Sequence, residues 1–131
     1  MFHDMYWQDV VSQADRWDSW TKNVIDLVKE DGFAQHGIPG RRQAKVVLLE
    51  VGAGDNVMTV RHTSESLLRT FDEAGAHTRL VRVNPDLPLG DAMDCEPDGR
   101  FGYCVVSVMA RGLDSLQRMD RAMKASGQKI V

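Results

Sequence analysis

The sequence predicts an α/β fold in which an open sheet of parallel strands carries flanking helices. Three short apolar runs, Lys45–Val51, Thr78–Asn84 and Gly102–Met109, have the length and the β-branched content of strands. Segments with the apolar spacing of helices precede the first run, separate it from the second and follow the third. Because parallel strands need a long crossover connection, we expect the three runs to be parallel neighbours in one sheet.

The composition limits what the chain can be. Its 131 residues suffice for one domain, and a fold of this size buries roughly two-thirds of its unfolded surface. The net charge of −3 argues against a general electrostatic grip on nucleic acid or anionic lipid. No apolar run approaches the ~20 residues that span a membrane, and the first ten residues contain no basic stretch typical of a targeting signal. Two cysteines cannot form a disulfide framework, so we expect an intracellular chain in a reducing compartment.

We expect a single domain over residues 1–131, organised in three parts. Residues 1–44 hold an edge-strand remnant at Met1–Tyr6, a helix and a loop. Residues 45–125 form the core of alternating strands and helices, and residues 126–131 form a tail.

Apolar residues three and four apart predict the first helix over Gln8–Lys29. We expect it to end before the glycine-rich loop that begins at Gly32. Trp17 and Trp20 are interpreted as core side chains of this helix. The alternative is a patch that faces a partner, because a half-sized fold leaves apolar surface uncovered.

The first strand, Lys45–Val51, is an apolar run of the kind that is buried on both faces of a parallel sheet. The next helix is expected to be capped by Thr63 or Ser64 and to stop at Gly75. The last helix carries apolar residues at helical spacing, namely Leu113, Leu116, Met119 and Met123.

The loop over residues 85–99 is rich in proline and in acidic residues. Its motif D-x-E-x-D-G, starting at Asp94, imitates the beginning of a calcium loop, but there is no glutamate at the twelfth position. We therefore expect a solvated acidic loop and no metal. Its negative charges raise the pKa of the Cys95 thiol, which should be unreactive, and Cys104 is expected in the core.

The strongest chemical signal is the turn Gly52-Ala53-Gly54, which follows the first strand directly. A glycine turn at the carboxyl end of a buried strand lets backbone N–H groups approach a ligand closely, and open α/β sheets bind ligands at such ends. The structural alternative is that these glycines serve only to provide a positive φ angle.

The segment LLEVGAG, Leu48 to Gly54, resembles the strand, acid and glycine turn of methyltransferases that use S-adenosylmethionine. That family usually has a third glycine and an acid at the end of the next strand. Here Asp55 and Asn56 follow the turn, and the next strand ends in Asn84. This makes a methyltransferase fragment the weakest of the hypotheses.

Four segments, in the right order, resemble the C-terminal half of the sirtuins, the NAD-dependent protein deacylases, and particularly their bacterial branch. They are MFHD from Met1, the QxxRWxxW pattern from Gln13 to Trp20, VLLEVGAGDNVMTVR from Val47 to Arg61, and LVRVNP from Leu80 to Pro85. The resemblance covers most of the chain. It implies half of a Rossmann-type α/β domain with a glycine turn facing NAD.

The resemblance also implies a set of NAD-binding positions. These are Gly52, Ala53, Gly54, Asp55, Asn56 and Asn84, with Asn84 at the strand end that holds the adenosine ribose in that family. A strand-ending Asn before a proline is the structural alternative for Asn84. Asp55 puts a carboxylate where the family has a hydroxyl near the phosphates, and a like charge there is unfavourable by about 1 kcal/mol or more.

The family's first NAD loop, catalytic histidine and zinc-binding cysteines have no counterpart in this sequence. We therefore expect no catalytic residue here, and the leading hypothesis is a non-catalytic structural or interaction subunit held by protein partners. The main alternative is the NAD-binding half of a deacylase that another chain completes.

Scattered basic residues and histidines form no recognisable site. His3, His36, His62 and His77 have no ligand spacing, so no metal is expected. Arg61 with His62, and Arg41 with Arg42, are interpreted as solvated surface charge, although a small basic lip near the glycine turn is the alternative.

Overall fold

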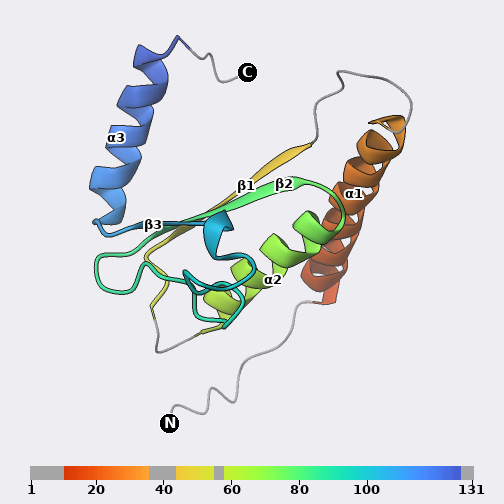
Figure 1. The fold of residues 1–131 in the computed structure, drawn as a ribbon, viewed down its shortest axis with the longest axis horizontal. Helices are drawn as coiled ribbons and strands as arrows, with labels where there is room; N and C mark the ends of the chain where they lie inside the picture. Colours follow the sequence, from red (N-terminus) through yellow and green to blue (C-terminus); the bar gives the residue numbers. More distant parts are fainter. Residues whose placement is uncertain (1–10, 36–43, 55–57, 128–131) are drawn as a thin grey trace.

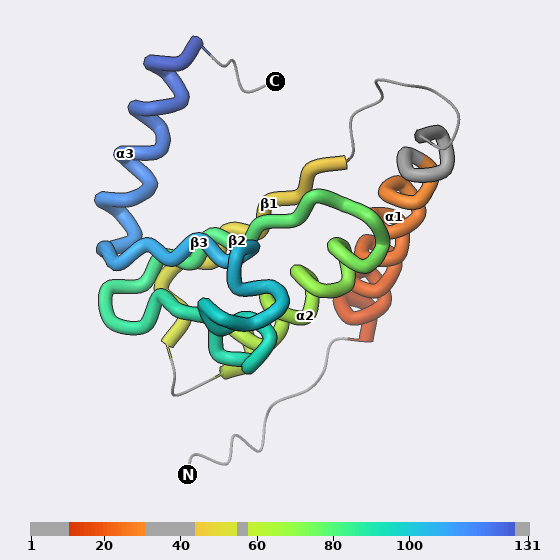
Figure 2. The backbone as a smooth tube through the Cα atoms, in the orientation of Figure 1, coloured from red at the N-terminus to blue at the C-terminus, as the bar shows by residue number. Residues whose placement is uncertain are grey.

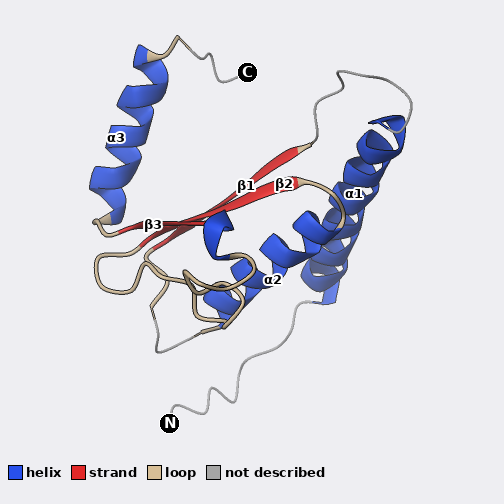
Figure 3. Cartoon of the chain, viewed as in Figure 1, coloured by secondary structure: helices blue, strands red, loops and turns tan. Residues whose placement is uncertain are grey.

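The structure is a computed structural model that describes residues 11–35, 44–54 and 58–127, with side chains for 11–30, 44–54 and 58–127. Along the chain it contains the elements drawn in Figure 1 and, by type, in Figure 3. They are α1 (Val11–Gln35), β1 (Lys45–Val51), α2 (Thr59–Glu73), β2 (His77–Val83), the short 3₁₀ helix η1 (Gly102–Cys104), β3 (Val105–Val108) and α3 (Gly112–Ala125). The predicted α/β class is confirmed.

The three strands form one parallel sheet in the order β1-β2-β3. Their register places Leu49 beside Val81 and Val81 beside Val106, so these side chains make a row across the sheet. The prediction of three parallel neighbours is therefore confirmed. The predicted edge strand at Met1–Tyr6 lies outside the described residues.

One face of the sheet is covered by helices. Figure 1 shows α2 and α1 on one side of the strands and α3 on the other. The helix α2 packs on β1 and β2, and α1 packs on α2. Two apolar clusters fill these contacts: one around Leu68, Leu80 and Phe101, and one around Val28 and Phe71.

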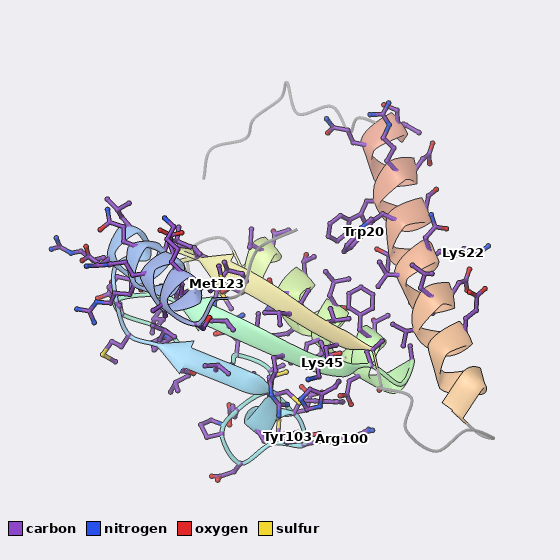
Figure 4. The ribbon with its side chains drawn as sticks, turned by 90° about the horizontal axis from the view of Figure 1, so that it is seen from above. Trp20, Lys22, Lys45, Arg100, Tyr103 and Met123 are labelled. Carbon is purple, nitrogen blue, oxygen red and sulfur yellow. The ribbon has the colours of Figure 1, made fainter. Side chains whose placement is uncertain are left out.

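The first helix is longer at its carboxyl end than predicted. The apolar spacing indicated an end at Lys29, whereas α1 continues to Gln35 and passes through Gly32. A glycine inside a helix costs only about 1 kcal/mol relative to alanine, which the packing of Val28 against the second cluster can offset. Trp20 lies on the side of α1 that faces the sheet and Lys22 on the opposite side (Figure 4).

The second helix begins four residues before the predicted cap. The hydroxyls of Thr63 and Ser64 donate to the carbonyls of Thr59 and Val60 inside the helix, so neither residue caps it. The residue that precedes the helix, Met58, makes no side-chain capping hydrogen bond. The predicted stop is confirmed, because Gly75 follows the helix with a φ angle of +106°.

The bounds of the other two strands also differ slightly from the prediction. β2 begins at His77 and ends at Val83, one residue earlier at each end. The segment expected to start the third strand at Gly102 forms η1 instead, and Cys104 in it is fully buried, as expected of a core residue. A Cβ on Gly102 would clash with the carbonyl oxygen of Glu96, so loop 85–99 packs too closely for any other residue at this position.

The opposite face of the sheet is uncovered along most of its length. Val47, Leu49 and Val51 of β1 and Val106 of β3 are between 41% and 66% exposed, and they alternate with residues that point toward α2. We call these four residues, together with the half-buried Val81, the open face. Figure 4 looks onto this side and shows α3 over the left ends of the strands, α1 at their right, and no helix in front of their middle. The expectation that the first strand is buried on both faces is wrong for this chain, because no described element covers the second face.

The last helix leaves the sheet instead of lying on it. A Cβ on Gly112 would stand 2.6 Å from Cγ1 of Val51, so α3 begins in close contact with the end of β1. From there α3 runs away from the strands (Figure 2). Beyond Met119 all of its described residues are exposed.

Candidate functional site: the glycine turn and the buried ion-pair cluster beneath it

The glycine turn lies at the carboxyl ends of the strands, where the fold class places ligand sites. Gly52 has a φ angle of +71° and its N–H donates to the Val83 carbonyl at 2.9 Å. A Cβ added at Gly52 or Gly54 would meet no atom of the described residues within 4 Å. These two glycines therefore leave open space above the turn, which is room that a ligand could occupy.

The Asn84 side chain makes three hydrogen bonds to the chain's own backbone. Its Nδ2 donates to the Ala53 carbonyl at 2.8 Å, and its Oδ1 accepts from the N–H groups of Asp86 and Leu87 at 2.9 Å each. Asn84 is also buried. The structure thus brings Asn84 and the glycine turn together, as predicted, but the Asn84 amide joins the turn to the next loop.

Arg61 makes a second hydrogen bond to the same turn. Its Nη1 donates to the carbonyls of Ala53 and Leu87, and its Nη2 donates to that of Leu89. The guanidinium also binds Asp91 in a bidentate pair, with 2.7 Å between Nη2 and Oδ1. The interpretation of Arg61 as solvated surface charge is wrong, because the side chain is buried in α2 against the loop.

Arg82 sits at the centre of the cluster and is fully buried. It binds the Glu50 carboxylate with two parallel hydrogen bonds of 2.6 and 3.0 Å, and its Nη1 donates to Glu65 at 2.9 Å. The same Nη1 lies 3.2 Å from Asp91. Glu50 and Arg82 are directly opposite in the register of β1 and β2, which is why the fork can form.

Glu65 extends the cluster to the backbone of the loop that follows β2. Its two carboxylate oxygens accept from the N–H groups of Asp91 and Ala92 at 2.7 and 3.0 Å. Five charged side chains therefore form one unit, which we call the ion-pair cluster: Glu50, Arg61, Glu65, Arg82 and Asp91. The Arg82 pairs with Glu50 and Glu65 join β2 to β1 and α2, and the contacts of Arg61, Glu65 and Arg82 with residues 87–92 hold the loop against them.

The charges in the ion-pair cluster stabilise one another. Burial disfavours the charged form of Asp91, but hydrogen bonds from Arg61 and the charges of Arg61 and Arg82 outweigh it, so the pKa of Asp91 is lowered. Burial likewise opposes the charge of Arg82, and the carboxylates of Glu50 and Glu65 raise its pKa nonetheless. Two guanidiniums thus face three carboxylates, and removing any one of these side chains should destabilise the fold because its partners would stay buried without it.

The cluster also accounts for the acid in the motif LLEVGAG. Both oxygens of Glu50 are used by Arg82 in the interior of the sheet. Asp55 and Asn56, which the resemblance implied as NAD-binding positions, lie outside the described residues.

Other predicted features have mixed outcomes. The acidic loop is not simply solvated, because Cys95 within it is buried and Asp94 pairs with Arg69 at 2.9 Å. Burial, followed by the charges of Glu65 and Asp94, raises the pKa of the Cys95 thiol to about 12, in agreement with the predicted lack of reactivity. The two tryptophans are only partly core. Trp17 and Trp20 are each 46% exposed, and Trp20 meets Phe71 edge-on at 6.2 Å.

Sequence reasoning did not identify the ion-pair cluster. The available signal was a charged residue inside each of two apolar strands, Glu50 in KVVLLEV and Arg82 in HTRLVRV. Charges at such positions are rarely buried unless they are paired. The choice of Glu65 and Asp91 as further partners depends on how α2 and the loop pack, which the sequence does not encode locally.

Within the described residues, no group of three or more His, Cys, Asp or Glu side chains is placed to hold a metal ion. None of their helices combines the length and the apolar character needed to cross a membrane.

Comparison with known proteins found no matching family model, no matching curated protein and no matching solved structure.

Proposed function

We propose that this chain is a non-catalytic structural subunit, built on half of a nucleotide-binding type of sheet and held in place by protein contacts. The observation that carries the proposal is the contrast between the two faces of the sheet. The face toward α2 contains the ion-pair cluster, whereas the other face presents the aliphatic open face, with Lys45, His77 and Arg79 at its amino-terminal end. Parallel sheets are normally covered on both faces, so a bare aliphatic face is a surface for another protein.

The engagement of Asn84 and Arg61 supports the same proposal. Ala53 accepts hydrogen bonds from both side chains, and both also bind the loop after β2. These contacts use the side chains of Asn84 and Arg61 for the chain's own backbone instead of for a ligand. The end of the sheet is therefore organised as a rigid support.

The test compares the chain in extracts of the cells that make it with two matched variants. We expect the wild-type chain to elute well above its own mass of 14.7 kDa, and Leu49→Glu to shift it to the monomer position. Leu27→Glu places the same charge at an exposed position of α1 and should leave the elution unchanged. Elution as a monomer, with no effect of Leu49→Glu, would refute the interaction function.

A second candidate is the adenosine side of an NAD site that another chain completes, and the open space above Gly52 and Gly54 favours it. We expect calorimetry with NAD or ADP-ribose to show no binding by the unmodified chain. Asp55→Ser removes a carboxylate near the expected phosphate position and should produce at most weak binding. Micromolar binding by the unmodified chain would favour this second candidate over the structural subunit.

A further inference from the structure

The surface left uncovered by this chain has two parts of different shape. The open face is flat and presents the row Leu49, Val81 and Val106, with Val47 and Val51 beside it on β1. It carries no acidic side chain. The second part is a helix.

The helix α3 presents its own apolar stripe. Leu113, Leu116, Met119 and Met123 are three or four residues apart and therefore lie along one side of the helix. Leu113, Leu116 and Met123 are between 37% and 68% exposed. Figure 4 shows Met123 on the side of α3 that is nearer to the strands.

The chain does not bring these two parts together itself. Residues 109–111 connect β3 to α3 and bring Gly112 against Val51, from where the helix departs from the sheet. The close approach of α3 to the strands is at its first residue, Gly112, beside Val51. Among the described residues, no element covers the open face or most of the stripe, so both are available for intermolecular contacts.

A helix on parallel strands is the packing that α2 already makes on the other face. Each copy of the chain has one uncovered amphipathic helix and one uncovered strand surface. Two copies can therefore cover both surfaces on each other. We infer that the chain forms a two-fold dimer in which the stripe of α3 from each copy packs on the open face of the other. This inference rests on the proposed structural function and names its partner as a second copy, in a closed and self-complementary arrangement.

The available area fits a stable dimer. Full burial of a Val, Leu or Met side chain removes about 100 Å² of apolar surface, so seven half-exposed side chains supply roughly 350 Å² per copy and roughly 700 Å² per dimer. Met109, which is 72% exposed between β3 and α3, and the half-buried Val81 and Met119 add to this. The apolar share of a standard interface is about 900–1,000 Å². The stripe alone or the open face alone would supply only about half of the roughly 700 Å², so the dimer needs both contacts.

Sedimentation velocity of the full chain at concentrations from micromolar upward tests the dimer. We expect a mass of twice 14.7 kDa for the wild type. Leu49→Glu on the open face and Leu116→Glu on the stripe should each weaken the dimer at least about 100-fold, because each buries an unpaired carboxylate. Leu27→Glu, at an exposed position of α1 outside the open face and the stripe, should not change the dissociation constant. Circular dichroism will show that each variant retains its helix and strand content.

Mixing the two weakened variants tests the reciprocal geometry. The stripe of Leu49→Glu and the open face of Leu116→Glu are both intact, so a mixed dimer has one complete contact. We expect the mixture to dimerise more tightly than either variant alone. A wild-type monomer at all concentrations, or a dimer that neither substitution weakens, would overturn the inference. A monomer that still joins another protein through Leu49 in cell extracts would also overturn it, while leaving the proposed structural function standing.

Discussion

Replacing Arg82 by methionine is expected to lower the free energy of unfolding by about 3–5 kcal/mol. Methionine keeps much of the aliphatic volume of the arginine stem but removes the charge that pairs Glu50 and Glu65. Both carboxylates are buried, so the variant leaves two negative charges in the interior without their shared cation. A loss of this size is a large part of the ~5–15 kcal/mol that stabilises an ordinary domain.

Urea unfolding followed by circular dichroism, at one fixed protein concentration, measures this effect. Arg118→Met is the matched control, because Arg118 is exposed on α3 and its loss should change the stability by less than ~0.5 kcal/mol. The loss in the free energy of unfolding for Arg82→Lys should lie between those of Arg82→Met and Arg118→Met. An ammonium keeps the charge but cannot form the two parallel hydrogen bonds to Glu50. If Arg82→Met loses less than ~1 kcal/mol, the ion-pair cluster does not hold the loop to the sheet as the contacts indicate.

Replacing Phe71 by alanine is expected to lower the free energy of unfolding by about 3–5 kcal/mol. The ring of Phe71 is fully buried between α2 and α1, in the cluster that contains Val28 and Ala76. Its removal leaves a cavity and deletes the edge-on contact with Trp20, at 6.2 Å between ring centroids. Because α1 rests on α2 through this cluster, the variant should also loosen α1.

Urea unfolding gives the stability change, and tryptophan fluorescence reports on α1 because Trp17 and Trp20 both lie on it. Leu27→Ala removes a large side chain from an exposed position of the same helix and should cost less than ~0.5 kcal/mol. Equal losses for Phe71→Ala and Leu27→Ala would mean that α1 does not depend on the packing of Phe71.

The two sets of experiments separate internal stability from assembly. Arg82 and Phe71 act within one copy of the chain, on the covered face of the sheet. Leu49 and Leu116 are half-exposed, and their substitution should alter association while leaving the internal contacts in place. Residues that face α2 and residues on the open face alternate along β1, so neighbouring positions in the sequence have different roles.

The order and kind of the elements could be predicted because they depend on local patterns. Apolar runs of strand length, helical spacing between them and the Gly75 stop each act over a few residues, and the structure confirms them. The proximity of Asn84 to the glycine turn also followed, because the carboxyl ends of adjacent parallel strands lie at one edge of the sheet. The ends of helices were less predictable. A glycine such as Gly32 can end a helix or lie within it, and the hydroxyls of Thr63 and Ser64 can cap a helix or bond to a carbonyl inside it.

The sequence by itself therefore determined a parallel α/β sheet with a glycine turn at its carboxyl edge, because periodicity and turn chemistry are local properties of the chain. Only the tertiary structure decided that Arg61 and Arg82 are buried, since their partners Asp91 and Glu50 are 30 and 32 residues away in the chain. It also decided that one aliphatic face stays uncovered. A strand's pattern shows which residues share a face, but whether that face is covered depends on where the connecting helices lie.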